Sequence, residues 1–174
     1  MTLIKNKNII GFAAYSGTGK TTLIKNIVSI LKKRKYKVSV IKHAHHNFDI
    51  DHKGKDSYEI RKAGAENILI SSKKRWALLH ENVNNKELSL DELLNIIKNL
   101  NSDIILVEGF KYENFPKIEL YRKIIGKNFL YTKDKNIIAI ASNEPIKCKI
   151  DIDILDLNNP NQIVDYIINY FNIK

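Results

Sequence analysis

The run Ala14-Tyr15-Ser16-Gly17-Thr18-Gly19-Lys20-Thr21 follows an apolar stretch, Ile9 to Ala14, and opens an amphipathic one, Leu23 to Leu31. Strand, glycine-bearing loop and helix in this order are the context that a phosphate-binding P-loop requires. The glycines let backbone N–H groups point inward as an anion site, and the helix adds the positive end of its dipole. The usual pattern begins with Gly where this chain has Ala14, and a small residue with negative φ is tolerable there. The sequence therefore predicts a nucleoside triphosphate site.

The side chains of this loop have separate expected roles. Lys20 can reach the β- and γ-phosphates and stabilise charge on a transferring phosphoryl group, which makes it a candidate catalytic residue. The hydroxyl of Thr21 can hold Mg²⁺. The expected nucleotide-binding set of the loop is Ser16, Gly17, Thr18, Gly19, Lys20, Thr21 and Thr22.

Apolar, β-rich runs alternate along the chain with amphipathic ones. Continuous apolar runs suit parallel strands that are covered on both faces. The pattern predicts an α/β fold, a P-loop NTPase three-layer sandwich with a mainly parallel central sheet, as a single nucleotide-binding domain over residues 1–174. The predicted strands are Ile9–Ala14, Val38–Lys42, Ile68–Ser71, Trp76–Leu79, Ile104–Val107, Ile118–Tyr121 and Ile137–Ala141. The predicted helices are Lys20–Lys33, Tyr58–Ala63, Leu90–Leu100 and Gln162–Phe171.

Composition narrows the class of protein. No apolar run approaches the ~20 residues that cross a bilayer, and the N-terminus lacks the arrangement of a signal peptide. Cys148 is the single cysteine, so no internal disulfide is possible and a cytoplasmic location is expected. The net charge of +10 is spread over the chain, and no signature of a nucleic-acid-binding module accompanies it. We therefore expect neither a nucleic-acid nor a membrane partner.

A carboxylate for the metal is expected at the end of a strand beside the P-loop strand. Glu108 follows the apolar run Ile104–Val107 and emerges at the carboxyl end of that strand, where open α/β sheets bind ligands. Gly109 then allows the chain to turn close to the phosphates. Asp103 lies at the opposite end of the strand and is not assigned to the metal. Thr21 and Glu108 are therefore the expected Mg²⁺ ligands.

The polar stretch from Lys42 to Ser57 is dense in side chains that bind metals or protons. One interpretation is a transition-metal site, although the spacing matches no tight tetrahedral motif. The favoured interpretation is a switch loop, in which an aspartate holds Mg²⁺ through water or orients the attacking water. Asp51 and Asp56 are the candidate catalytic residues, and Asp56 could equally cap the next helix. The candidate transition-metal ligands are His45, His46 and His52 with the aspartates.

A residue that reads the base is expected on a late loop, beyond the end of another strand. The run Ile137–Ala141 leads into Ser142-Asn143-Glu144-Pro145, and the Asn143 amide offers both a donor and an acceptor to a purine edge. The same residues are typical of a simple turn. The guanine-reading Asn-Lys-x-Asp of regulatory GTPases is absent, so this motif leaves the base open.

Several runs beyond the P-loop resemble the MobB family, the accessory proteins of molybdopterin-guanine dinucleotide biosynthesis. The His-His run and the run Gly54 to Tyr58 are far more specific to that family than a P-loop alone. The last part of the chain resembles the family only loosely. The similar runs, in chain order, are Phe12 to Leu23, Ile41 to His46, Gly54 to Ala65, Arg75 to Leu78, Ile105 to Lys111 and Lys117 to Arg122.

The resemblance implies a homodimer that binds GTP with Mg²⁺, hydrolyses it weakly and supports a molybdopterin guanylyltransferase that joins GMP to molybdopterin. Molybdopterin itself is a further candidate ligand, and His43 and His45 could contact a phosphate or a pterin. By matching position, the triphosphate site, the acid Glu108, Asp56 and the run His43–His46 carry over. The stretch Phe115 to Tyr121 is the expected kind of dimer surface.

A small-molecule kinase with ATP as donor is the alternative from another class. Kinases of this size contribute an arginine-rich lid over the phosphates. The arginines Arg61, Arg75 and Arg122 are scattered, although Lys73-Lys74-Arg75 could serve. A preference for GTP or for ATP separates the two functions.

Overall fold

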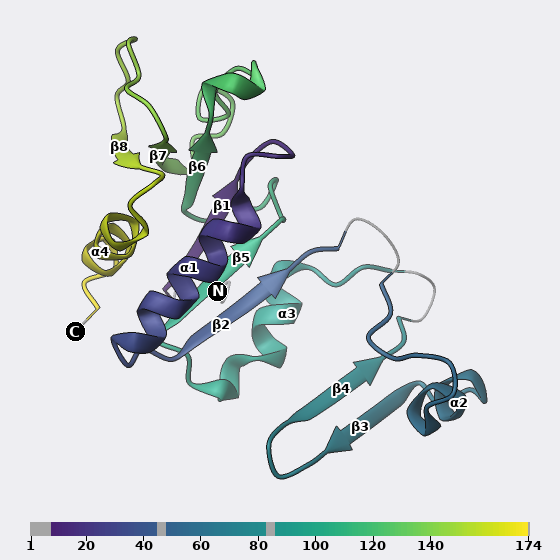
Figure 1. Cartoon of the computed structure of the whole chain (residues 1–174). Coiled ribbons are helices and arrows are strands. Elements are labelled where there is room, and N and C mark those ends of the chain that lie inside the picture. Colours follow the sequence, from purple (N-terminus) through teal and green to yellow (C-terminus); the bar gives the residue numbers. More distant parts are fainter. Residues whose placement is uncertain (1–7, 45–47, 83–85, 174) are drawn as a thin grey trace. The chain divides into compact units, whose positions relative to one another are not determined.

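The computed structural model describes residues 8–44, 48–82 and 86–173 (Figure 1). The chain forms two compact units, Met1–His43 with Leu90–Lys174 and Ala44–Ser89. Compactness does not decide whether units fold independently, so the single domain over residues 1–174 stays a prediction. Each unit is described by itself.

The first unit is built on a six-stranded sheet with the order β2-β5-β1-β6-β7-β8, in which every pairing is parallel (Figure 1). The carboxyl ends of all six strands therefore share one edge. The predicted mainly parallel α/β sheet is confirmed. The strands are β1 (Ile9–Ala13), β2 (Val38–Lys42), β5 (Ile104–Glu108), β6 (Lys117–Tyr121), β7 (Ile137–Ser142) and β8 (Asp153–Asp156).

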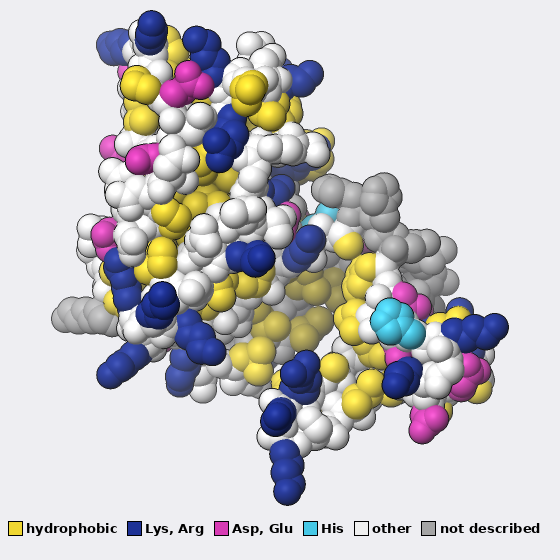
Figure 2. Space-filling model, viewed as in Figure 1, with side chains coloured by type: hydrophobic (Ala, Val, Ile, Leu, Met, Phe, Trp, Pro, Cys, Tyr) yellow, Lys and Arg dark blue, Asp and Glu magenta, His cyan; other side chains and the backbone are white. Residues whose placement is uncertain are grey.

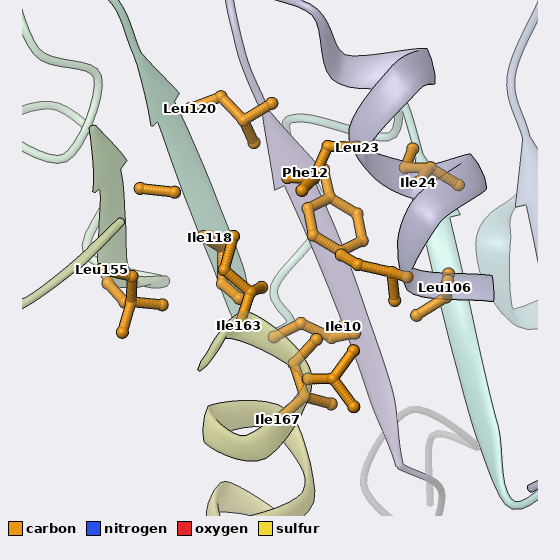
Figure 3. Packing of buried hydrophobic residues seen from close by; sticks show 14 of the residues in the cluster. Ile10, Phe12, Leu23, Ile24, Leu106, Ile118, Leu120, Leu155, Ile163 and Ile167 are labelled. Atoms are coloured by element: carbon orange, nitrogen blue, oxygen red, sulfur yellow. The ribbon is translucent and has the colours of Figure 1, made fainter. Parts of the chain in front are cut away.

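Helices cover both faces of this sheet because its strands are apolar on both. Alternate residues of a strand point to opposite faces. Ile10 accordingly belongs to the core under α1 (Lys20–Lys33) and α4 (Pro160–Tyr170), part of which is drawn in Figure 3. Its neighbour Ile9 belongs to a second core with α3 (Leu90–Ile96). The predicted three-layer sandwich is confirmed. No helix of the described residues is long and apolar enough to cross a membrane.

Strand β6 corrects one expectation. The stretch from Phe115 to Tyr121, expected as a dimer surface, lies inside the fold between β1 and β7. Lys117 and Glu119 are each 1% exposed, and both are satisfied by hydrogen bonds. Lys117 Nζ donates to the Glu113 carbonyl at 2.7 Å and to Asp134 Oδ2 at 3.0 Å. The expectation was wrong because the Tyr- and Ile-rich composition that suggested a surface belongs to a strand buried inside the sheet.

The second unit contains helix α2 (Asp56–Lys62) and an antiparallel hairpin of β3 (Asn67–Ser71) and β4 (Trp76–His80). These strands were predicted, but they do not join the parallel sheet. Opposed residues share a face of a hairpin. Leu69 and Leu78 are opposed, and with Trp76 they form an exposed apolar face, here called the hairpin face. Figure 2 shows Lys and Arg side chains at the β3–β4 turn.

Candidate functional site

The P-loop has the local structure that the sequence predicts. Strand β1 ends at Ala13, the loop follows, and α1 begins at Lys20. Gly17 and Gly19 have φ values of +80° and +95°, which side chains with a Cβ rarely adopt. Thr18 between them is buried, and its hydroxyl donates to the Tyr15 carbonyl at 2.7 Å. The loop is therefore curled, as an anion nest requires.

The carboxyl ends of three neighbouring strands bring a carboxylate between two lysines. Glu108 ends β5, the strand between β1 and β2, and its side chain is 15% exposed. Lys20 Nζ lies 3.8 Å from Glu108 Oε1, and Lys42 Nζ lies 3.7 Å from Glu108 Oε2. The predicted pair Lys20 and Glu108 is thus together. Lys42 was not assigned to the site from the sequence, although its place at the end of a strand next to β5 was the available signal.

The remaining oxygen donors of the loop fit magnesium better than a softer metal. Ser16, Thr21 and Thr22 are exposed around the start of α1, and their hydroxyls are hard ligands. Magnesium keeps several waters and binds through one or two protein groups plus substrate phosphates. Thr21 and Glu108 supply that type of donor set. They would hold the ion without a dedicated protein cage.

A transition-metal site finds no support within the described residues, which hold no cluster of three or more His, Cys, Asp or Glu that could bind an ion. His45 and His46 lie outside the described residues. His52 is exposed in the second unit. The transition-metal interpretation therefore stays a prediction.

The turn after Glu108 is closely packed against the end of β2. Gly109 has a φ of +100°, and a Cβ there would lie 2.5 Å from the Cβ of His43, so only glycine fits. The His43 N–H donates to the Glu108 carbonyl at 2.8 Å, and its ring lies 5.1 Å from that of Phe110. Phe110 also has a positive φ, +52°, which is uncommon for a bulky residue and marks a constrained backbone. His43 thus contacts the turn that follows Glu108.

Asn143 lies just beyond the carboxyl end of β7, where a base-reading residue was expected. The Oδ1 atom of Asn143 is buried and accepts no hydrogen bond from the described residues. The preceding Ser142 hydroxyl donates to the Glu144 carbonyl at 2.7 Å, which is turn chemistry. The turn is therefore present, and an acceptor on Asn143 remains unused by the protein atoms described.

The candidate switch aspartates belong to the second unit, so their catalytic role stays a prediction. Asp51 Oδ1 accepts from the His52 N–H at 3.0 Å, while Asp51 Oδ2 is buried without a described donor. Asp56 is the first residue of α2, and Lys55 takes the N-cap position without a side-chain cap bond. The alternative role of Asp56 as the cap is therefore wrong. Its charge still suits the positive end of that helix.

Asp49, one of the aspartates of the transition-metal interpretation but not a switch candidate, is bound by an arginine. Its carboxylate accepts two hydrogen bonds from Arg61 Nη2, at 2.8 and 2.6 Å. These bonds hold the pKa of Asp49 below its ordinary value. Arg61 also donates to Glu81 Oε1 at 3.1 Å. It therefore connects α2 to the segment before it, at Asp49, and to the segment after β4, at Glu81. Arg61 therefore has a structural role in this unit.

Two charged residues near the end of β6 have hydrogen-bond partners elsewhere in the chain, and one of them contacts the P-loop. The buried Glu119 carboxylate accepts from the N–H groups of Leu130 and Tyr131, both at 2.8 Å. Burial raises the pKa of Glu119 despite those bonds. Arg122 Nε donates to the carbonyl of Thr18 inside the P-loop at 2.9 Å. Sequence reasoning missed Arg122 because a single arginine has no motif.

The chain is similar to known proteins in family, sequence and fold. A family model described as molybdopterin guanine dinucleotide synthesis protein B matches residues 9–143. The chain is 41% identical over 163 residues to the molybdopterin-guanine dinucleotide biosynthesis adapter protein of Escherichia coli (strain K12), covering 93% of this chain and 92% of that protein. The Haemophilus influenzae protein of the same name is 41% identical over 162 residues, covering 93% and 88%.

Solved structures agree on the fold. The MobB protein homolog from Bacillus stearothermophilus superposes with a TM-score of 0.71 at 21% identity, covering 96% of this chain and 99% of that chain. The structure of Bacillus subtilis MobB gives a TM-score of 0.72 at 23% identity, covering 92% and 96%. At these identities the likeness concerns the fold, which matches the predicted P-loop architecture.

Proposed function

This chain belongs to the molybdopterin guanine dinucleotide synthesis protein B family, MobB, and on that premise we propose that it is a GTP-binding adapter protein of molybdenum cofactor biosynthesis. In this proposal the protein binds GTP with Mg²⁺ and hydrolyses it weakly. It supports a molybdopterin guanylyltransferase in attaching GMP to molybdopterin. Molybdopterin is a further candidate ligand.

The observation that supports nucleotide binding is the curled loop with Lys20 and Lys42 on either side of Glu108. An incoming triphosphate would replace Glu108 as the partner of Lys20. Thr21 and Glu108 would then hold Mg²⁺, which neutralises phosphate charge when bound. Glu108 thus has a partner in both states: the lysines before binding and the metal side afterwards. Such an exchange keeps the mostly buried Glu108 carboxylate paired, and an unpaired buried charge is costly.

Weak hydrolysis is the activity that we propose for this loop. Lys20 stabilises charge on the phosphoryl group. Positioning of the attacking water is assigned to Asp51 or Asp56 in the second unit. A role as an adapter needs the nucleotide-bound state more than it needs turnover.

Recognition of the base is assigned to Asn143. The free acceptor Oδ1 matches the N–H groups of a guanine edge, and the amide N–H₂ of Asn143 can donate to the same base. The loop lies at the shared carboxyl edge of the sheet, two strands away from β1. Open α/β sheets bind ligands along this edge.

A homodimer is part of the proposal, and the hairpin face supports it. Leu69, Trp76 and Leu78 are 67%, 59% and 50% exposed, and neighbouring apolar side chains of this kind mark association surfaces. A cytoplasmic location is the remaining element, supported by the lone Cys148 in a chain without a possible internal disulfide.

The deciding experiment is calorimetric titration of the protein with GTP and with ATP, each with Mg²⁺, followed by measurement of phosphate release. We expect a clear preference for GTP and very slow turnover. A preference for ATP would favour the small-molecule kinase instead and would call for a screen of phosphoryl acceptors. Absence of binding to either nucleotide would overturn the proposal.

A further inference from the structure

We propose that Arg122 is a phosphate-binding residue of the nucleotide site that also holds the P-loop in its binding conformation. The inference rests on the proposed nucleotide function of the loop. It assigns a second cation to the phosphates, supplied by the end of β6 and separate from Lys20.

The first observation is a hydrogen bond that joins two distant parts of the chain. Arg122 Nε donates to the carbonyl oxygen of Thr18 at 2.9 Å. Thr18 stands between Gly17 and Gly19, both with positive φ, in the loop where N–H groups are needed for an anion. In such a nest the N–H groups point inward, and the Thr18 carbonyl oxygen accepts from a donor in another part of the chain. Arg122 is that donor.

The second observation is the position of the far end of the guanidinium. Arg122 Nη2 lies 3.8 Å from the point that a Cβ on Gly19 would occupy. The guanidinium therefore extends along the Thr18–Gly19 peptide, immediately before Lys20. Ile125, on the next turn, places its Cδ1 3.8 Å from the corresponding point of Gly17. The segment after β6 thus supports the P-loop at both glycines.

The third observation is that the charge of Arg122 is uncompensated, unlike that of the two lysines. Lys20 and Lys42 each have Glu108 within 4.0 Å. Among the described residues, no carboxylate forms an ion pair with Arg122, whose hydrogen bond to Thr18 uses only Nε. The terminal N–H groups remain for another acceptor. A guanidinium fork matches phosphate oxygens in geometry and charge.

The strand register explains why β6 can supply this residue. Ala13, the last residue of β1, is paired with Glu119 of β6. Arg122 follows three residues later in an extended conformation (φ −132°), so it passes the end of the sheet beside the loop that leaves β1. Glu119 fixes the same stretch of β6 through its two bonds to Leu130 and Tyr131. The arginine is therefore delivered from a rigid strand end.

Titrations of Arg122→Ala, Arg122→Lys and the matched control Lys123→Ala test the proposal, with GTP, GDP and GMP in Mg²⁺ and in EDTA. Lys123 is the next residue, is exposed, and loses the same charge on substitution. Loss of a charge-assisted hydrogen bond should lower the affinity of Arg122→Ala for GTP and GDP about tenfold or more. The affinity of Arg122→Lys should lie between those of Arg122→Ala and the unaltered protein, because one ammonium cannot engage both Thr18 and a phosphate. Lys123→Ala should change affinity less than about twofold.

A direct readout separates phosphate contact from support of the fold. In ¹⁵N spectra of the arginine side chains, with Arg122 assigned from the Lys variant, inorganic pyrophosphate should shift the Arg122 guanidinium signals of the unaltered protein. Unchanged signals at saturating pyrophosphate would overturn the phosphate contact. So would GTP affinities of Arg122→Ala equal to those of Lys123→Ala while Lys20→Ala abolishes binding. If the unaltered protein binds neither GTP nor pyrophosphate, the proposed function itself fails.

Discussion

The two units of the chain differ in how far their large apolar side chains are buried. In the first unit, strands and helices enclose a core of fully buried apolar side chains, among them Ile10, Ile27 and Leu106. In the second unit the hairpin face leaves large apolar side chains in water. A two-stranded hairpin is marginal by itself, whereas a six-stranded sheet covered by helices is a stable support. The first unit therefore has a covered core, whereas the second unit exposes an apolar face.

The largest expected contrast is in stability. Ile27→Ala in α1 removes a fully buried side chain and should lower the free energy of unfolding by about 2–5 kcal/mol. Ile60→Ala is the matched change in α2 of the second unit, where the side chain is 53% exposed, and it should cost less than about 1 kcal/mol. Urea denaturation measures both. Equal losses would mean that the second unit has a core of its own and would break the comparison.

Nucleotide affinity should depend on the first unit almost entirely. Lys20→Ala removes the charge that faces the phosphates, and we expect GTP affinity to fall about 100-fold. Lys33→Ala removes a charge at the other end of the same helix and serves as the control. Calorimetry gives both constants. Retained affinity in Lys20→Ala would show that the loop does not bind the triphosphate.

The response to magnesium should be the next effect in size. Glu108→Gln keeps the shape of the side chain but removes its charge, so the gain in GTP affinity on adding Mg²⁺ should shrink about tenfold. Affinity in EDTA should be unchanged or higher, because Lys20 and Lys42 lose their carboxylate partner. Titrations with and without Mg²⁺ separate the effect on the magnesium response from the effect on nucleotide affinity itself. Equal losses under both conditions would exclude a role of Glu108 at the metal.

The smallest expected effect on folding lies on the hairpin face. Leu78→Ala should change the free energy of unfolding of the monomer by less than about 0.5 kcal/mol, because the side chain is already half in water. The same variant should weaken self-association, which sedimentation at a series of concentrations measures. Thr132→Ala, an exposed change in the first unit, is the control. An unchanged association constant would remove the hairpin face from any dimer.

The part of the fold that sequence could predict is the part with strong local patterns. The P-loop, α1 and the apolar strand before Glu108 were expected close to their observed places, because buried parallel strands and an amphipathic helix leave clear periodicity. Strand β8 was missed, since Asp153-Ile154-Leu155-Asp156 is short and has an acid at each end. Which strands pair with one another was harder to predict than where the strands lie in the sequence. Nothing in the alternation of β3 and β4 says that they pair only with each other.

In the candidate site too, residues with a local sequence pattern were predicted, and residues that depend on strand order were not. Lys20 and Glu108 were predicted together because each ends or follows a recognisable element, and neighbouring parallel strands end at one edge. Lys42 and Arg122 were not, because their closeness to the site depends on strand order, which a sequence of elements does not give. The burial of Glu119 and Lys117 was not predicted from the sequence. Buried charge is recognised only when its hydrogen-bond partners are known.

The order of the two units along the chain has an evolutionary consequence. The second unit, Ala44–Ser89, is an insertion between two segments of the first, Met1–His43 and Leu90–Lys174. Every strand of the six-stranded sheet is encoded outside the inserted segment. A gene lacking that segment would still specify the P-loop, Glu108 and Arg122 on one sheet. The segment 44–89 can therefore change in length or sequence by descent without a change in the strands of that sheet.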